Sequence, residues 1–469
     1  MFNEELFTGK PNETLRRHLA QILGAAVQAV EPAAAVKRFV SRRGDVFRVG
    51  DRSYDLRALR RIFVVGGGKG SAPMAAALEA ILGQRIASGI VNVKYGHTVP
   101  LERIQLVEAS HPLPDVAGQR GAEAMLALVR TAREGDLVIC VISGGGSALL
   151  PAPAGEMNLG DKVQVTDLLL RSGATIQEVN TVRKHLSRIK GGRLAQLAAP
   201  AHVAVLILSD VVGNPLDAIA SGPAVSDPTT FADALAIVER YGLEQRMPQA
   251  ALRYLRRGAA GEIPETPKPG DPAFARVQTV IVGSNDLAAT AAAGKAQKLG
   301  FVPLTLTTFL EGEAREAARV IASIVHSIQV AGTPAAPPAC LIAGGETTVT
   351  VRGQGKGGRC QEFALAAAMA MAEWSDAVMA AFGTDGTDGP TDAAGAMADG
   401  TTISRALSLG LSPRRALETN DAYPFFSALG DLIVTGPTNT NVNDLYVALI
   451  ARPDDRRSSM VDRRRRRRA

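Results

Sequence analysis

Aromatic residues are scarce in this chain. Phe, Tyr and Trp make up 4% of its 469 residues, and there is a single Trp. So few rings argue against a platform that stacks the bases of single-stranded nucleic acid. The three cysteines, Cys140, Cys340 and Cys360, lie in or beside apolar runs without the spacing of metal ligands. This usage predicts buried thiols in a reducing compartment.

The sequence also lacks a recognisable targeting signal and a long apolar run. Its acidic start, Met1 to Glu5, has no apolar segment of the kind found in signal peptides. No apolar run is long enough to cross a bilayer. We therefore expect a cytoplasmic protein without a membrane partner.

The net charge of +6 is confined to one end of the chain. Residues 452–469 contain nine Arg and three Asp, so the rest of the chain is formally neutral. A run such as Arg463–Arg468 is typical of a solvated tail. We predict a disordered Arg-rich tail over 452–469 and no nucleic-acid partner.

Short apolar runs that end in Gly, Ser or Asp alternate with Ala- and Leu-rich stretches. This alternation is typical of parallel α/β sheets. The Ala- and Leu-rich stretches predict helices, among them Pro73–Leu82 and one long helix over Thr175–Leu197. In the first part of the chain the predicted strands are Ile62–Gly66, Gly89–Val93, Gln105–Glu108, Leu137–Ile142 and Val203–Leu208.

A segment rich in Pro and Gly, 256–276, has no apolar period and predicts a linker. Strand patterns resume at Val277–Val282 and continue to Leu445–Ile450, and the β-branched run Thr347–Val351 suggests a hairpin. We therefore predict an α/β protein of two domains. The first, 1–255, is a Rossmann-like parallel-sheet αβα domain, and the second, 277–451, is a smaller mixed-sheet α/β domain.

Two glycine-rich turns follow predicted strands of the first domain. The first contains Gly67, Gly68, Lys69 and Ser71, and free N–H groups at the following helix start favour an anion there. Its spacing fits neither a Walker loop nor a dinucleotide fingerprint, because Lys69 precedes Gly and Ser71 stands where Gly or Ala is needed. The second turn consists of Ser143, Gly144, Gly145, Gly146 and Ser147.

Because ligands bind beyond the carboxyl ends of strands in open α/β sheets, the two turns together predict a binding site. Further candidates follow along the chain. Asn180, Arg183, Lys184 and Ser187 share one face of the predicted helix. Asp210 comes directly after an apolar strand, where it suits metal coordination, proton abstraction or a turn, and Asn214 follows it.

In the second domain, Glu346 follows two glycines and Arg359 opens a predicted helix. A guanidinium at a helix N-terminus is unfavourable for its own helix, and becomes favourable beside an anionic ligand. Three carboxylates, Asp385, Asp388 and Asp392, then crowd a glycine-rich loop. Such crowding indicates a cation or strong hydrogen-bond donors nearby.

Glycine turns, a Lys, an Arg and acidic loops are the parts that phosphoryl transfer needs. Five strings resemble, in the right order, the glycerate 2-kinases of the MOFRL type, the class II glycerate kinases, some of which are labelled hydroxypyruvate reductase. They are Asn180–Arg193, Ser209–Pro223, Gly344–Glu362, Gly383–Gly395 and Gly436–Asp444.

The resemblance implies two α/β domains with an active site in the cleft between them. It also implies ATP-dependent phosphorylation of D-glycerate to 2-phosphoglycerate with Mg²⁺. Lys69 and Arg359 match the active-site Lys and Arg proposed for the family, and the loop from Asp385 to Asp392 matches too.

We accordingly expect Lys69 and Arg359 to stabilise the transferred phosphoryl group. Asp210 and some of the three loop carboxylates would hold Mg²⁺ or take the proton from the C2 hydroxyl, and the Ser143–Ser147 turn would grip a carboxylate or phosphate. The expected partners are D-glycerate and ATP, in a monomer or homodimer. Two alternatives stay open: an NAD(P)H-dependent hydroxypyruvate reductase, and a non-catalytic sensor of sugar acids or nucleotides.

Overall fold

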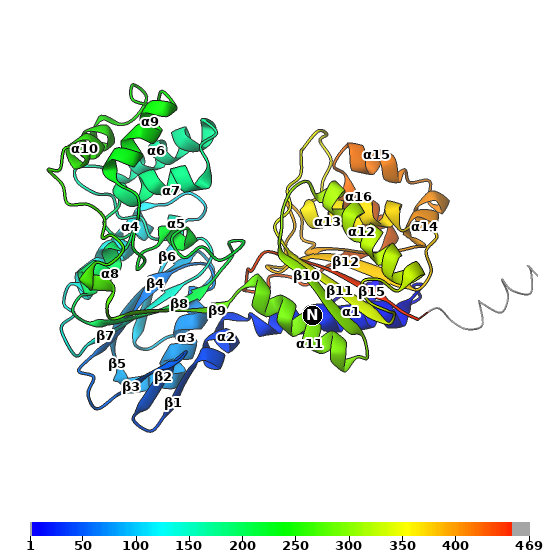
Figure 1. Ribbon diagram of the computed structural model, residues 1–469, viewed down its shortest axis with the longest axis horizontal. Coiled ribbons are helices and arrows are strands. Elements are labelled where there is room, and N and C mark those ends of the chain that lie inside the picture. Colours follow the sequence, from blue (N-terminus) through cyan, green and yellow to red (C-terminus); the bar gives the residue numbers. More distant parts are fainter. Residues whose placement is uncertain (1, 453–469) are drawn as a thin grey trace, which may run out of the picture. The chain divides into compact units, whose positions relative to one another are not determined.

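The computed structural model describes residues 2–452, which form two compact units (Figure 1). Unit 2 is one continuous stretch, Glu31–Ser284. Unit 1 combines the residues up to Val30 with those from Asn285 onward. Unit 2 is therefore inserted into the sequence of unit 1.

Unit 2 is built on a six-stranded parallel sheet with the strand order β6-β5-β4-β7-β8-β9. A separate antiparallel sheet, β1-β2-β3, precedes it in sequence. The strands are β1 (Val40–Arg43), β2 (Val46–Val49), β3 (Arg52–Asp55), β4 (Ile62–Gly67), β5 (Ile86–Lys94), β6 (Ile104–Ala109), β7 (Leu137–Ile142), β8 (His202–Leu208) and β9 (Val277–Gly283).

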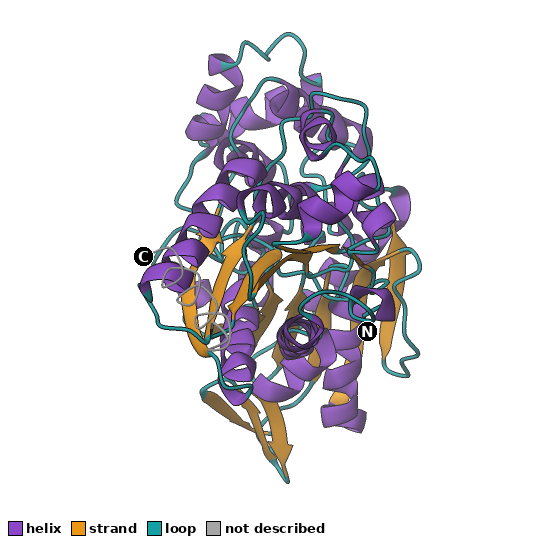
Figure 2. Ribbon diagram, turned by 90° about the vertical axis from the view of Figure 1, so that its right-hand side faces the viewer, coloured by secondary structure: helices purple, strands orange, loops and turns teal. Residues whose placement is uncertain are grey.

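Helices lie between several of these strands in sequence, as the pattern predicted, and Figure 2 shows helices beside the strands. The helices within 159–185 and 231–259 pack on one another in a cluster of their own (Figure 1). The helices of unit 2 are α2 (Pro32–Phe39), α3 (Ser71–Leu82), α4 (Val116–Val129), α5 (Gly146–Leu149), α6 (Leu159–Arg171), α7 (Ile176–His185), α8 (Arg193–Ala198), α9 (Phe231–Arg240) and α10 (Gln249–Ala259). Local signals start several of them. Asn158 with Asp161, for example, forms a capping box at the start of α6 and satisfies two backbone N–H groups.

The register of unit 2 gathers strand ends at one edge of the sheet. Gly67 of β4 lies opposite Ile142 of β7, which lies opposite Ile207 of β8. All three strands are parallel, so the loops that follow them begin side by side (Figure 1). The two glycine turns and Asp210 therefore start from neighbouring positions.

Unit 1 contains a six-stranded mixed sheet with the order β10-β11-β15-β12-β13-β14. Only β10 and β11 are paired in parallel. The strands are β10 (Val302–Leu310), β11 (Ala339–Gly345), β12 (Ala377–Gly383), β13 (Gly395–Asp399), β14 (Leu432–Ile433) and β15 (Asp444–Ile450). The helices are α1 (Glu13–Ala29), α11 (Asn285–Lys298), α12 (Ala314–Ala331), α13 (Arg359–Ala370), α14 (Thr402–Ser408), α15 (Pro413–Glu418) and α16 (Ala422–Leu429).

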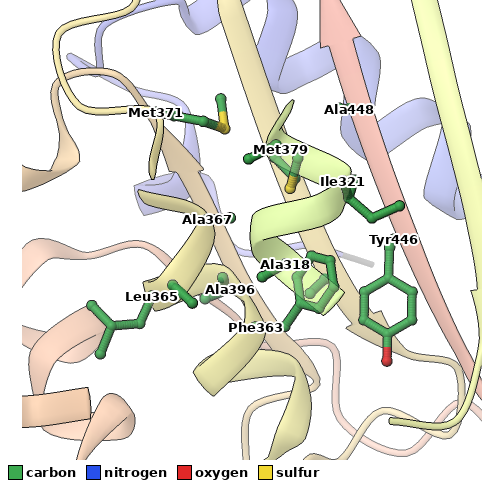
Figure 3. Packing of buried hydrophobic residues seen from close by; sticks show 14 of the residues in the cluster. Ala318, Ile321, Phe363, Leu365, Ala367, Met371, Met379, Ala396, Tyr446 and Ala448 are labelled. Carbon is green, nitrogen blue, oxygen red and sulfur yellow. The ribbon is translucent and has the colours of Figure 1, made fainter. Parts of the chain in front are cut away.

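The core of unit 1 lies between its sheet and helices α12 and α13. Figure 3 shows Ile321 of α12 and Phe363 of α13 beside Tyr446 of β15. The rings of Phe363 and Tyr446 are 4.2 Å apart between centroids. Tyr446 is the polar member of this cluster, and its hydroxyl reaches the edge of the sheet where β15 begins.

Strand β15 runs antiparallel to both of its neighbours. Its first residue, Asp444, lies opposite Gly345 at the end of β11 and Gly383 at the end of β12. The antiparallel direction therefore brings an acidic residue at a strand start to the loops that follow two other strands.

The structure confirms the α/β class, the parallel sheet and the mixed sheet, but it divides the chain at other positions than predicted. Val277–Val282 is a strand, yet as part of β9 it completes the first sheet beside β8. The predicted linker, 256–276, lies inside unit 2 and contains the end of α10. Apart from Arg452, the predicted Arg-rich tail lies outside the described residues.

The N-terminal helix also belongs to the other unit than predicted. Arg16 of α1 is fully buried and binds Asp399 at 2.7 Å and Asp431 at 3.1 Å, both from the C-terminal half of the chain. Both acids are buried too, so these ion pairs anchor α1 in unit 1. Nothing in the local sequence of α1 signals partners so distant along the chain.

Two predicted elements are wrong. Thr347–Val351 is not a strand, because Thr348 forms only an isolated bridge to Glu313. The predicted helix Thr175–Leu197 is two helices, α7 and α8. The first ends at His185, and Gly191 and Gly192, with φ of 57° and 80°, directly precede the second.

No single helix of the described chain is both long and apolar enough to cross a bilayer. Only α1 and α2, taken together as a bent pair, reach that length and composition.

Candidate active site

The two glycine turns of unit 2 are joined through Ser143. Its Oγ accepts a hydrogen bond from the backbone N–H of Gly70 at 2.9 Å and lies 3.0 Å from Ser71 Oγ. The Lys69 N–H donates to the Gly144 carbonyl at 2.8 Å. A Cβ on Gly68 would lie 2.1 Å from Ser143 Oγ, so this contact requires glycine. The structure thus brings both predicted turns, including Gly67 at the end of β4, into one unit.

Lys69 carries the free positive charge of these turns. Its half-buried side chain makes no hydrogen bond or ion pair with any residue in the described part of the chain. His111 lies beside Gly145, where a Cβ would come 2.8 Å from the imidazole and 3.5 Å from Lys69 Cγ. Burial, then the charges of Lys69 and Lys94, lower the pKa of His111 to about 4. This edge of the sheet is therefore basic and suited to an anion.

Asp210 joins the same group from the loop after β8. A Cβ on Gly144 would lie 2.2 Å from Asp210 Oδ2, so the carboxyl packs directly against the second glycine turn. Asn214 follows in the same loop with φ of 53°, which Asn tolerates better than most residues. The predicted Asp210 is thus close to the predicted Ser143–Ser147 turn.

A chain of hydrogen bonds connects the second turn to α7. Ser147 Oγ lies 3.0 Å from Ser221 Oγ, which in turn donates to Asn180 Oδ1 at 3.0 Å. Ala220 and Ser221 have φ of 51° and 59°, an uncommon conformation for these residue types. A strained backbone beside a polar cluster indicates a functional segment.

The two cations predicted on α7 have different surroundings. Lys184 is buried and binds Asp217 at 3.2 Å and Asp227 at 3.5 Å, so its charge is already balanced. Arg183 has no hydrogen bond or ion pair with a described residue. Ser187 lies beyond the end of α7 and bridges Pro153 in the chain before α6.

In unit 1, Arg359 is held by two carboxylates. Its Nε and Nη2 donate to Asp444 at 2.6 and 3.1 Å, and its Nη1 donates to Glu346 at 2.6 Å. Burial opposes the charge of Arg359, but Asp444 and then Glu346 raise the pKa of its guanidinium. Burial raises the pKa of Asp444 to about 6 against the opposing effect of Arg359.

The acidic loop of unit 1 does not form a cluster of free carboxylates. Asp388 caps α13, because its two oxygens accept from the N–H groups of Cys360 and Gln361 at 3.0 and 2.8 Å. Burial, as the largest cause, raises the pKa of Asp388 to about 7. Asp392 is exposed and accepts from Tyr423 at 2.7 Å. Asp385 accepts from Thr387 through Oδ1 alone.

The hydrogen bonds of the three loop carboxylates reduce the number of oxygens available for the predicted metal site. Within residues 2–452 no group of three or more His, Cys, Asp or Glu side chains is arranged to hold a metal ion. A Mg²⁺ ion bound through substrate phosphates needs only one or two carboxylates. Of the three loop carboxylates, Asp385 and Asp392 each retain an oxygen, Oδ2, that accepts no hydrogen bond from a described residue.

A pocket of about 660 Å³ lies next to these residues, entirely within unit 1. Its volume is in the range of small-molecule sites. Arg359, Asp385 and Asp388 line it, together with Gly355, Gly357 and Gly358 of the loop before α13.

The sequence analysis missed three residues of this site as candidates. Asp444 binds Arg359, Asn443 donates to Glu346 at 2.8 Å, and Tyr446 donates to Asp444 at 3.1 Å. Asn443 and Asp444 directly precede the apolar run of β15. An acid at the start of a strand could have been found by assuming that this strand is antiparallel.

Comparisons with known proteins identify the family of this chain. A family profile described as a domain of unknown function, DUF4147, matches residues 18–256, and the MOFRL family matches residues 339–444. A glycerate 2-kinase from Pyrococcus horikoshii is 43% identical and covers 92% of this chain and 96% of its own length. The chain belongs to the glycerate 2-kinase family.

Solved structures extend this similarity to the fold of the family. The crystal structure of a glycerate kinase from Thermotoga maritima superimposes with a TM-score of 0.85 at 40% identity, covering 94% of this chain and all of that one. A relative from Agrobacterium vitis is 46% identical over 93% of this chain and 94% of its own length, and it is provisionally named a hydroxypyruvate reductase. Family members thus carry two different enzymatic names.

Proposed function

We propose that this protein transfers the terminal phosphoryl group of ATP to the 2-hydroxyl of D-glycerate, giving 2-phosphoglycerate and ADP. The similarity to proteins named glycerate 2-kinase, over more than nine-tenths of the chain, carries this proposal. The basic edge of unit 2 supports it, because Lys69 is a cation without a partner among residues 2–452 and lies at two joined glycine turns.

Lys69 and Arg359 stabilise the negative charge of the transferred phosphoryl group, which is the main task of a protein in phosphoryl transfer. The N–H groups and hydroxyls of the Ser143–Ser147 turn hold an anionic part of a reactant. Asp210, which packs against that turn, takes the proton of the 2-hydroxyl or holds the metal.

Mg²⁺ enters this proposal as part of the nucleotide complex. It supplies charge neutralisation of the phosphates. Asp385 is its best protein ligand in the acidic loop, because it lines the pocket of unit 1, whereas Asp392 does not and Asp388 is committed to the start of α13. The cytoplasmic location, the absence of nucleic-acid and membrane partners, and the monomeric or homodimeric state stay predictions of the sequence.

An assay coupled to enolase tests the activity. The chain is incubated with ATP, Mg²⁺ and D-glycerate, and phosphoenolpyruvate is followed after enolase is added. Enolase dehydrates 2-phosphoglycerate and does not act on 3-phosphoglycerate, so the expected signal identifies the phosphorylated hydroxyl. ADP formation without that signal, or no ADP formation, would reject the proposal.

A further inference from the structure

Three cations of unit 2 lie close together without an acidic partner. Lys162 of α6 is 6% exposed and Lys190, between α7 and α8, is fully buried. Arg183 of α7 completes the group. None of the three forms an ion pair with any described residue.

The two lysines donate hydrogen bonds to carbonyls close to the hydrogen-bonded residues Ser147, Ser221 and Asn180. Lys190 Nζ donates to the Ala220 carbonyl at 3.1 Å, and Ser221 is the next residue. Lys162 Nζ reaches only the Leu186 carbonyl, at 3.4 Å. Ser221 links Ser147 to Asn180, and Arg183 lies one helical turn beyond Asn180 on the same face of α7.

The charges of this cluster act on one another. Burial, and then the charge of Arg183, lower the pKa of Lys162 to about 7. Burial, then Lys162 and Arg183, lower the pKa of Lys190. Burial alone lowers the pKa of Arg183, with no carboxylate nearby to raise it.

The neighbouring acids are all engaged elsewhere. Asp217 and Asp227 bind Lys184, and Asp161 caps α6. A buried positive charge without a partner is costly, and three of them together are more so. An anionic ligand would remove that cost.

We propose that Arg183 and Ser147 bind the carboxylate of the 2-hydroxy acid substrate, next to the buried Lys162 and Lys190. The inference rests on the proposed function and deepens it, because it assigns the end of the substrate that is not phosphorylated. A guanidinium fork and a hydroxyl match the two coplanar oxygens of a carboxylate.

Lys162 and Lys190 act here as positioning residues. Lys190 donates to the Ala220 carbonyl and so fixes the strained Ala220–Ser221 segment. Ser221 of this segment is hydrogen-bonded to the Ser147 hydroxyl. Lys162 adds positive potential next to Arg183. Neither ammonium needs to touch the substrate.

The first test replaces the guanidinium. Arg183→Gln is compared with Arg171→Gln, an exposed arginine of α6 paired with Asp167. Binding of D-glycerate to the full chain is measured by calorimetry without nucleotide, and KM is measured for both substrates. We expect the affinity of Arg183→Gln for D-glycerate to fall roughly 10- to 100-fold, as for hydrogen bonds to charged groups. KM for ATP changes less than about twofold, and Arg171→Gln behaves as the wild type.

Other outcomes separate this inference from the proposed function. A raised KM for ATP with unchanged D-glycerate binding would overturn the inference and assign Arg183 to a phosphate. Wild-type turnover with unchanged D-glycerate affinity in Arg183→Gln would overturn the inference alone. A wild type that binds D-glycerate without turnover, and loses binding in Arg183→Gln, would support the inference while the proposed function fails.

The second test removes a buried charge and keeps the length of the side chain. In Lys162→Met we expect weaker D-glycerate binding and a melting temperature that does not fall, because the uncompensated buried charge is gone. Lys37→Met, at an exposed lysine of α2, is the control. A lower melting temperature with unchanged D-glycerate binding would show that Lys162 only supports the fold.

Discussion

Arg359 and Asp444 are joined by two parallel hydrogen bonds, Nε to Oδ2 at 2.6 Å and Nη2 to Oδ1 at 3.1 Å. The pair connects the first residue of α13 to the first residue of β15. Asp444 is almost completely buried and also accepts from Tyr446, whose ring packs on Phe363 in the core. The guanidinium is therefore oriented by the core of unit 1 before any substrate arrives.

Asp444→Asn should destabilise unit 1. Breaking a buried ion pair costs about 3–5 kcal/mol when the remaining charge has no other partner, and Glu346, which still pairs with Arg359, reduces this cost. The single tryptophan, Trp374, stacks on His326 in unit 1, so its fluorescence during urea unfolding reports on this unit. Glu418→Gln, which breaks the exposed pair with Arg414, should change the free energy of unfolding by less than about 1 kcal/mol. Equal effects of the two variants would contradict this account.

Lys69→Ala should reduce kcat by at least about 100-fold, because charge stabilisation dominates phosphoryl transfer. Its melting temperature should stay near that of the wild type, since Lys69 makes no side-chain hydrogen bond or ion pair with the described chain. Activity assays and thermal unfolding of the same preparation measure both. If kcat and the melting temperature fell together, Lys69 would stabilise the glycine turn and not the transferred phosphoryl group.

Two carboxylates of one loop should respond differently to Mg²⁺. Asp385→Asn should raise the Mg²⁺ concentration for half-maximal activity by about 10-fold, because Asp385 lines the pocket and has a free oxygen. Asp392→Asn should leave it unchanged, because Asp392 is exposed and bound to Tyr423. Titration of activity with Mg²⁺ compares them. A larger effect of Asp392→Asn than of Asp385→Asn would assign the metal to Asp392.

The free energy of unfolding should rise with pH above neutrality because of Lys162. Its pKa is about 7 in the folded protein and 10.5 as the ordinary value, so unfolding takes up a proton between these pH values. The depressed pKa therefore lowers the stability of the folded protein most at and below pH 7, and this loss is relieved as the pH rises from 7 toward 10.5, by at most about 1.4 kcal/mol per pH unit. Urea unfolding from pH 7 to 9 should show a smaller slope in Lys162→Met. An identical slope in both proteins would contradict a depressed pKa.

Neither NADH nor NADPH should be oxidised when hydroxypyruvate is added to this protein. The contact between Gly68 and Ser143 closes the first glycine turn, and Ser71 stands where a dinucleotide fingerprint needs Gly or Ala. Absorbance at 340 nm measures the reaction directly. Oxidation at a rate comparable to phosphorylation would support the reductase named among the relatives. Binding of ATP and D-glycerate without any turnover would instead support a sensor.

The sequence predicted best where local chemistry decides the structure. Apolar runs ending in glycine gave β4 and β7, and the parallel sheet then placed their turns at one edge. Predictions failed where the position of a residue depends on partners far away in the sequence. Arg16 selects its unit through Asp399 and Asp431, and Asp444 meets Arg359 only because β15 runs antiparallel. The acidic loop illustrates a third limit, since Asp388 and Asp392 serve the fold by capping a helix and holding a tyrosine.

Because unit 2 is inserted into unit 1, the two parts of unit 1 are synthesised at different times. Arg16 is separated from its partners by 383 and 415 residues, whereas every strand of unit 2 is complete by Gly283. At roughly 5–20 residues per second, α1 leaves the ribosome about 20 s or more before the carboxylates that will bury its arginine exist. Unit 2 can fold in that interval. The apolar face of α1 stays exposed until the rest of unit 1 has been synthesised. Newly made chains are therefore most vulnerable to aggregation through a helix at their beginning, and a chaperone that shields this helix should raise the yield of the protein.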